Sequence, residues 1–308
     1  MIINTGCRTD IPAYFSQWFF QRIREGYVHV RNPYYQNQVV KYKLTPNVVD
    51  CLAFCTKNPA PMLPRIHELD AFGQFWFVTI TPYGKEIEPQ VPPKEKVIDD
   101  FKKLSIIVGA EKMGWRYDPI FITSKYTLDS HIENFEKMAS TLSGYTHDCV
   151  TSFIDLYEKT KRNFSGVKEV TKEERAIIAK EFVRIGKRYD IQIKSCVEGQ
   201  DLSKYGVDCS GCMTKPVIER AISNNLKVPH KKSPRDSCNC LLGNDIGAYN
   251  TCGHGCIYCY ANTNQQSVRI NIKRHNQNSP FLIGGSLSDD VVKEARQESF
   301  INNQITMF

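Results

Sequence analysis

Three cysteines near the end of the sequence are spaced so that one short loop can offer them to a single metal centre. They lie in the stretch CGHGCIYC and are Cys252, Cys256 and Cys259. Three thiolates can hold a [4Fe–4S] cluster and leave one iron open to an exogenous ligand. The two glycines between the first two cysteines let the backbone wrap closely around such a group. The alternative is a zinc site that takes its fourth ligand from His254 or Cys240.

The spacing of this motif, with Tyr258 directly before the last cysteine, resembles the cluster loop of radical S-adenosylmethionine (radical SAM) enzymes. The resemblance implies that the open iron and Tyr258 bind S-adenosylmethionine, and that reduction cleaves this cofactor to a 5′-deoxyadenosyl radical. In those enzymes the loop follows the first strand of a barrel, whereas here it follows the predicted strands. A late strand around residues 245–249, lying beside the first strand, would bring the loop to the same mouth in a permuted order.

The remaining cysteines of this region are enough for a second metal site. They are Cys196, Cys209, Cys212, Cys238 and Cys240. We expect four of them to hold an auxiliary [4Fe–4S] cluster. Structural zinc is the alternative, since Cys209 and Cys212 have the spacing of a zinc knuckle, and unligated thiols are the third interpretation.

The elements that must position these cysteines alternate between short β-rich runs and amphipathic helical segments. Strands are predicted at 1–6, 48–56, 75–82, 115–123, 148–157 and 190–196, with helices at 13–26, 92–109, 130–142 and 172–189. This alternation predicts an α/β fold, specifically a (β/α) barrel, complete or partial, rather than an open doubly wound sheet. We expect residues 1–195 to be the barrel scaffold and residues 196–308 to be an iron–sulfur region that closes over its mouth. The tail at 286–299 is predicted to be a terminal helix.

Charged residues follow several predicted strands at their carboxyl ends, where parallel barrels carry their chemistry. They are Arg8, Asp10, Lys57, Arg116 and Asp118. The three cations suit carboxylate or phosphate groups of a substrate. The two aspartates could bind a sugar or an amine, or they could be ion-pair partners of Arg8 and Arg116. His131 lies on a predicted helix and is expected to be structural.

The whole chain resembles the bacterial proteins grouped as domain of unknown function 1848, which have a C-terminal cysteine motif like that of radical SAM enzymes. The resemblance runs through RTDIP (8–12), REGYVHVRNP (24–33), TKNPAP (56–61), YGKEIEP (83–89), WRYDPI (115–120) and DIGAYNTCGHGCIYCYAN (245–262). It implies that the auxiliary ligands are Cys196, Cys212, Cys238 and Cys240, with Cys209 spare.

Two further cysteines depart from the family pattern, which more often has Arg at position 7 and Trp at position 55. Cys7 and Cys55 lie at predicted strand ends. They could bind a metal or react with substrate at the mouth, or they could be small buried hydrophobic residues.

Composition narrows the remaining choices. The chain has 308 residues, a formal net charge of +7 and 41% hydrophobic residues, which is ordinary globular composition. No apolar run is long enough for a membrane span, and the first residues do not resemble a secretory signal, so we expect a cytoplasmic protein with no membrane partner.

We therefore expect an iron–sulfur enzyme that cleaves S-adenosylmethionine and acts on a small-molecule substrate, with a reducing partner such as ferredoxin or flavodoxin. One alternative is an electron-transfer or sensing protein without radical chemistry. Another is a nucleic-acid modification or repair enzyme of the spore photoproduct lyase type, which the mild charge does not favour.

Overall fold

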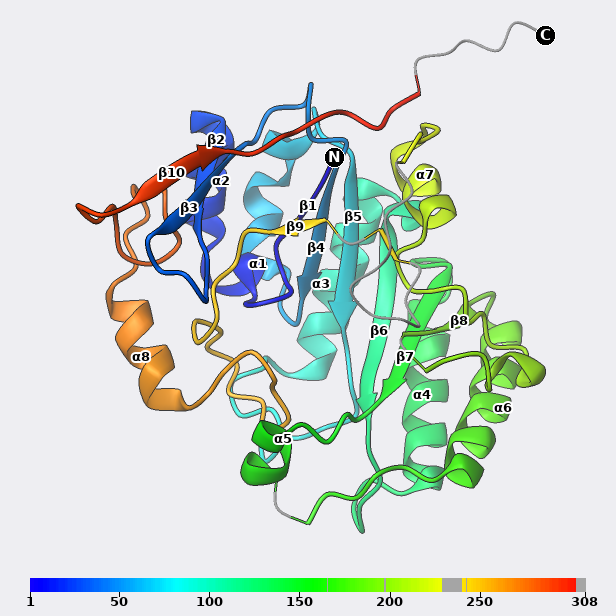
Figure 1. Ribbon diagram of the computed structural model, residues 1–308. Coiled ribbons are helices and arrows are strands. Elements are labelled where there is room, and N and C mark those ends of the chain that lie inside the picture. The colour runs from blue at the N-terminus through cyan, green and yellow to red at the C-terminus, as the bar shows by residue number, and fades with distance from the viewer. Residues whose placement is uncertain (165, 197, 229–239, 242, 303–308) are drawn as a thin grey trace, which may run out of the picture.

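A seven-stranded parallel sheet forms the centre of the protein in the computed structural model, which describes residues 1–164, 166–196, 198–228, 240–241 and 243–302. The strand order is β8-β7-β6-β5-β4-β1-β9. The strands are β1 (Ile2–Asn4), β4 (Cys51–Thr56), β5 (Gln74–Thr79), β6 (Met113–Ile120), β7 (Asp148–Phe153), β8 (Gln192–Ser195) and β9 (Asn244–Asp245). Neighbouring strands all run parallel, so their carboxyl ends meet at one edge (Figure 1).

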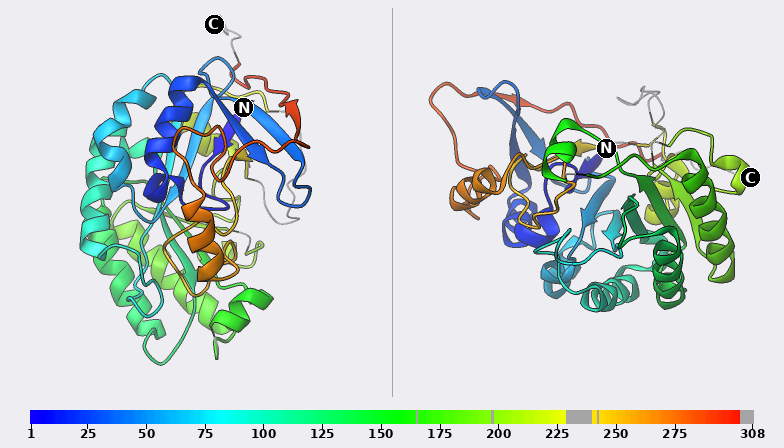
Figure 2. Two further views of the ribbon diagram at one scale, coloured as in Figure 1. Left: turned by 90° about the vertical axis from the view of Figure 1, so that its left-hand side faces the viewer. Right: turned by 90° about the horizontal axis from the view of Figure 1, so that it is seen from below.

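Helices cover one face of this sheet (Figure 2). They include α1 (Ile11–Tyr14), α2 (Ser16–Glu25), the 3-10 helices η1 (Ala60–Leu69) and η2 (Ala110–Lys112), α3 (Lys94–Val108), α4 (Leu128–Leu142) and α6 (Lys172–Arg188). Most of the buried apolar side chains lie between these helices and the sheet, with Trp18, Trp76 and Trp115 among the largest. Thr171 and Glu174 form a capping box that starts α6, which satisfies two of its unpaired backbone N–H groups.

A smaller apolar cluster covers the other face of the sheet, and α7 (Lys215–Ile222) packs there near the amino-terminal ends of the strands (Figure 1). Phe75 and Phe77 of β5 contribute to it from the sheet, and Val217 and Ile218 contribute from α7. We refer to these residues, together with Cys212 and Cys240, as the α7 cluster.

The predicted α/β fold is confirmed, and strands β1 and β4 to β8 lie within or beside the predicted segments. Strands β1 and β4 to β8 follow one another across the sheet in chain order. The late strand predicted around 245–249 is reduced to the two residues of β9, which pairs in parallel with β1 and overlaps the predicted segment at Asp245. A closed ring is not shown, because β8 and β9 are the two edges of the described sheet.

A second sheet of three strands was not predicted. It contains β2 (Tyr27–Arg31), β3 (Gln38–Lys43) and β10 (Val291–Glu294), in the order β10-β3-β2. The predicted tail helix at 286–299 is therefore wrong. The backbone of this segment pairs in parallel with β3, and Asp290 forms an ion pair with Arg31, so tertiary contacts override the local helical pattern.

The remaining elements are short. They are α5 (Glu158–Asn163), η3 (Ser203–Tyr205) and α8 (Gln265–Lys273), and both α5 and α8 lie near the carboxyl-terminal edge of the large sheet (Figure 1). None of the helices in the described part of the chain has the length and apolar character that crossing a bilayer requires.

Candidate functional site

The predicted site residues gather at the carboxyl-terminal edge of the sheet. Asp10 follows β1, Lys57 follows β4, and Arg116 and Asp118 lie in the last part of β6. The cysteine loop at 252–259 follows β9 and lies at this same edge (Figure 1). The fold therefore brings the loop to the edge where parallel α/β proteins carry their chemistry.

His254, in the middle of the cysteine motif, ties the loop to the end of β1. Its Nε2 atom lies 2.7 Å from Oδ2 of Asp10, and its Nδ1 atom lies 3.1 Å from the hydroxyl of Tyr14. The backbone N–H of Lys57 also donates to Oδ2 of Asp10, at 2.8 Å. Both His254 and Asp10 are buried, so the loop is held by a desolvated polar contact rather than by surface charges.

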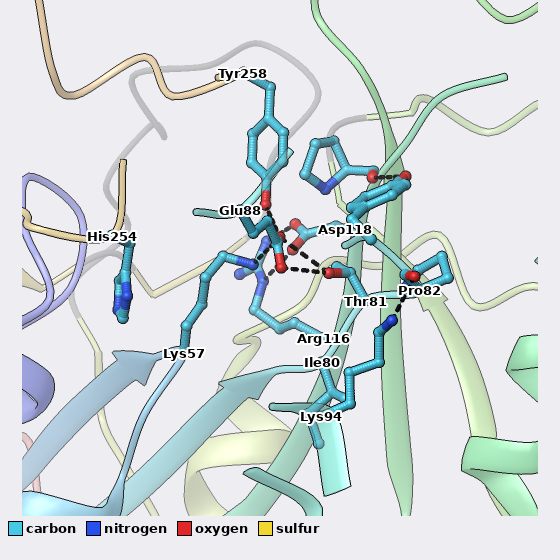
Figure 3. Close-up of polar contacts among 12 residues, drawn as sticks. Lys57, Ile80, Thr81, Pro82, Glu88, Lys94, Arg116, Asp118, His254 and Tyr258 are labelled. Atoms are coloured by element: carbon cyan, nitrogen blue, oxygen red, sulfur yellow. Dashed lines mark hydrogen bonds and ion pairs between the residues drawn. The ribbon is translucent and has the colours of Figure 1, made fainter. Parts of the chain in front are cut away.

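Glu88 is the centre of a second polar network beside the loop, drawn in Figure 3. Its Oε1 atom accepts from Nζ of Lys57 at 2.8 Å, from Oγ1 of Thr81 at 2.9 Å and from the hydroxyl of Tyr258. Burial by itself would raise the pKa of Glu88, but the Lys57 ammonium and these hydrogen bonds lower it overall. Burial would likewise lower the pKa of Lys57, but the charge of Glu88 and its hydrogen bond raise it overall. Lys57 is therefore a fixed cation near Cys256.

The three loop thiols are half-buried. Burial raises the pKa of Cys256 to about 12, although Lys57 acts in the opposite direction. Burial and the Asp10 carboxylate also raise the pKa of Cys252 well above its usual range. Thiols must lose their protons to bind a metal, so loading this loop would release protons.

Two arginines at this edge are already paired with carboxylates. Nε of Arg116 lies 3.2 Å from Oδ1 of Asp118, and Nε of Arg8 lies 2.8 Å from Oδ1 of Asp245. Asp118 is thus the partner of Arg116, one of the two alternatives from the sequence, whereas Asp10 is not the partner of Arg8. With Lys57 paired to Glu88, all three predicted anion-binding cations are neutralised by neighbouring carboxylates.

A small hollow of about 220 Å³ lies next to Glu88, between the end of β5 and the start of α3. Thr81, Glu88 and Lys94 are among its lining residues. Nζ of Lys94 donates to the carbonyl of Pro82 at 2.6 Å, as Figure 3 shows, and burial lowers the pKa of Lys94. The hollow offers a small molecule both a carboxylate and an ammonium group.

Three of the predicted auxiliary cysteines touch one another in series. Sγ of Cys212 lies 3.3 Å from Sγ of Cys240 and 3.7 Å from Sγ of Cys196. The backbone N–H of Met213 donates to Sγ of Cys240 at 3.3 Å. The fourth predicted ligand, Cys238, lies outside the described residues. The thiol of Cys209 contacts the carbonyl of Val207 and packs in the large core.

Cys7 and Cys55 differ in their surroundings. Cys7 is exposed, and its backbone N–H donates to Oδ2 of Asp245 at 2.8 Å. Cys55 is half-buried against the α7 cluster, and burial raises its pKa to about 11 even though Arg116 lowers it in part. The interpretation as a small core residue suits Cys55 better than Cys7.

The residues that sequence reasoning missed lie far along the chain from their partners. The sequence places Glu88 only inside a family segment, predicts Asp245 only as part of the late strand, and offers His254 only as an alternative zinc ligand. His131 agrees with its predicted structural role, since it is buried between the hydroxyl of Tyr117 and the carbonyl of Phe121, both at 2.9 Å.

Comparison with known proteins decides the family. A family model described as "Domain of unknown function (DUF1848)" matches residues 2–261. The chain belongs to the DUF1848 family. The match covers the large sheet, the auxiliary cysteines and the cysteine loop. No curated protein and no solved structure matches this DUF1848 chain.

Proposed function

We propose that this DUF1848 protein is an iron–sulfur enzyme whose loop thiols, Cys252, Cys256 and Cys259, hold a [4Fe–4S] cluster that binds S-adenosylmethionine. The observation that supports this most is the attachment of a three-thiol loop to the carboxyl-terminal edge of a parallel sheet through Asp10 and Glu88. When bound, such a cluster supplies an open iron and an electron for the reductive cleavage of S-adenosylmethionine to a 5′-deoxyadenosyl radical.

The donor set fits a cluster better than a single ion. A tetrahedral zinc site needs four ligands, whereas the loop offers three thiols and both ring nitrogens of His254 are already in contact with Asp10 and Tyr14. A [4Fe–4S] cluster needs only three thiolates when its fourth iron stays open to another ligand. Three thiols in one loop, with Lys57 nearby to balance their negative charge, meet this requirement.

The residues of the chain have separate tasks in this proposal. His254 and Asp10 hold the loop on the end of β1, while Glu88 fixes Lys57 and Tyr258 beside it. The hollow next to Glu88 gives a small-molecule substrate a place at the same edge. We regard the sheet as the partial form of a radical SAM-type (β/α) barrel with a permuted loop, working in the reducing cytosol.

For the auxiliary thiols, the sulfur separations favour a single tetrahedral ion over the second cluster expected from the sequence. With a Zn–S bond of about 2.3 Å, the sulfurs of a tetrahedral site are roughly 3.8 Å apart. The separations of 3.3 Å and 3.7 Å at Cys212 are close to this value. The three described thiols do not form a complete metal site by themselves. We therefore propose structural zinc at Cys196, Cys212 and Cys240 with Cys238, the fourth ligand that the family resemblance implies, and a second [4Fe–4S] cluster as the alternative.

Anaerobic purification followed by metal, sulfide and product analysis tests the proposal. We expect about four irons and four sulfides per chain, together with one zinc. After reduction with dithionite and addition of S-adenosylmethionine, we expect 5′-deoxyadenosine. A protein with iron but no 5′-deoxyadenosine would favour the electron-transfer alternative, and a protein without iron would refute the proposal. About eight irons and no zinc would instead support a second [4Fe–4S] cluster at the auxiliary thiols.

A further inference from the structure

The segment that carries the cysteine loop and α8 is free of negatively charged side chains. The sequence has 33 acidic residues in 308, or about one in nine, yet none lies between Asp245 and Asp289. The same stretch contains Arg269, Lys273 and Arg274. A negatively charged group that approaches this segment therefore meets no repulsion from the segment's own side chains.

The outward face of α8 combines positive charge with an exposed apolar side chain. Gln266, Arg269, Ile270 and Lys273 are spaced by three and four residues, and all four are exposed. Val268 faces the protein and is buried, whereas Ile270 is 52% exposed. Within the described part of the chain, neither Arg269 nor Lys273 forms an ion pair, in contrast to the cations at the site. Apolar contact surrounded by unpaired charge is typical of a transient protein interface.

This helix is fixed against the cysteine loop. A Cβ atom at Gly255 would lie 3.1 Å from Nε2 of Gln265, so the first residue of α8 packs directly on the loop. Nδ2 of Asn271 donates to the carbonyl of Asn250 at 3.0 Å. Both views of the ribbon show α8 beside the loop (Figures 1 and 2). A partner bound to α8 is therefore held close to the loop thiols.

An open surface hollow of about 490 Å³ continues this surface between the end of α8 and the start of α2. Tyr14, Gln17, His275 and Gln277 are among its lining residues. Tyr14 connects the hollow to the loop, because its hydroxyl contacts Nδ1 of His254. The hollow gives a side chain of a docked partner a place to insert next to the loop.

We infer that the outward face of α8 and this hollow form a docking surface for a small acidic protein that carries single electrons at low potential. The inference rests on the proposed function, because it assigns the route by which the loop receives its electron. One electron leaves the reduced carrier, which becomes oxidised by one electron, and enters the group held by the loop. Opposite charges steer such an encounter, and the exposed isoleucine supplies apolar contact.

Binding of flavodoxin, an acidic protein of this type, tests the surface independently of any iron. The variant is Arg269→Glu with Lys273→Glu, and the matched control is Lys96→Glu with Lys187→Glu, which makes the same change of charge at exposed positions of α3 and α6. In low salt we expect the α8 variant to bind flavodoxin at least tenfold more weakly by calorimetric titration, and the control to bind like the unaltered protein. In stopped flow, reduction by reduced flavodoxin should slow to the same degree, while reduction by dithionite stays unchanged.

The outcomes separate this inference from the proposed function. Equal weakening in both variants, or weakening in neither, would overturn the docking surface even if the protein contains iron. Tighter binding of a DNA oligonucleotide than of flavodoxin, lost in the α8 variant, would overturn it in favour of a nucleic-acid surface. Selective weakening in a protein that lacks iron would keep the surface and refute the cluster.

Discussion

The loop thiols at 252–259 and the thiols of Cys196, Cys212 and Cys240 have different surroundings. The loop is half-buried and held by charged and hydroxyl groups, through His254 on Asp10 and Tyr258 on Glu88. Cys212 and Cys240 are buried in the α7 cluster, with only sulfur and backbone N–H groups as polar neighbours in the hydrogen bonds of the described residues. A polar, accessible thiol set suits exchange of ligands and electrons, whereas a dry one suits a permanent structural ion.

The largest expected effect comes from removing one thiol of each set. Cys256→Ala should lose about four irons per chain and all detectable 5′-deoxyadenosine, with zinc retained. Cys212→Ala should lose zinc and unfold at a temperature several degrees lower, because the α7 cluster loses its central contact. Metal analysis and calorimetry of both variants, with Cys209→Ala as a control that keeps both metals, measure this. Loss of iron from Cys212→Ala alone would reverse the assignment of the two sets.

The polar network beside the loop should be sensitive to loss of a single charge. Lys57→Met leaves Glu88 buried without its cation, so we expect about 3 kcal/mol loss in the free energy of unfolding of the metal-free protein. The double variant Lys57→Met with Glu88→Gln should recover most of this loss, since no uncompensated charge remains. Urea unfolding at pH 7 measures both, and Lys41→Met, which breaks the exposed pair with Glu294, serves as the control with no measurable change. A single variant as stable as its control would show that the network is dispensable.

Cys55, which packs against the α7 cluster, predicts a pH dependence. Its pKa is raised from 9 to about 11 in the folded protein, so folding favours the protonated thiol. The protonated thiol of Cys55 therefore stabilises the folded state by roughly 2 kcal/mol below pH 9, and this stabilisation is lost as the pH rises through 11. Wild type should therefore lose stability faster than Cys55→Ser between pH 9 and pH 11 in urea unfolding of the metal-free protein. If both proteins lose stability equally between pH 9 and pH 11, the buried environment described for Cys55 is contradicted.

The smallest effect is expected at Tyr14, a half-exposed residue that helps to hold the loop by contacting His254. Tyr14→Phe removes the hydroxyl that contacts His254 and should lower the free energy of unfolding by about 1 kcal/mol. Tyr34→Phe is the matched control, because Tyr34 is 82% exposed and far less constrained. The comparison needs only thermal unfolding of the two variants. An equal loss in both would mean that Tyr14 does not hold the loop.

The sequence was sufficient for the parts of the fold that depend on local pattern. Buried β-rich runs such as 51–56 and 74–79 identify strands, and regular alternation with helices identifies a parallel sheet. The β10 strand could not be predicted in this way, because its conformation is set by pairing with β3, about 250 residues earlier. The strand-end rule located Lys57 and Arg116 and offered Asp118 as a partner of Arg116, but it did not identify Glu88 as the partner of Lys57. Glu88 and His254 acquire their roles only when the segments meet in space.

The pairing of β9 with β1 has a consequence for how the protein is made. Until residues 244–245 leave the ribosome, β1 has β4 as its one strand neighbour in the large sheet, and its outer edge is open. The end of β1 also lacks Asp245 and His254, which bind Arg8 and Asp10 in the finished fold. The site edge is therefore completed last during synthesis, after most of the sheet has formed. A chain interrupted before β9 would carry a nearly whole sheet in which β1 is an exposed edge strand. Such an edge can pair with other chains, so the interrupted protein would tend to aggregate.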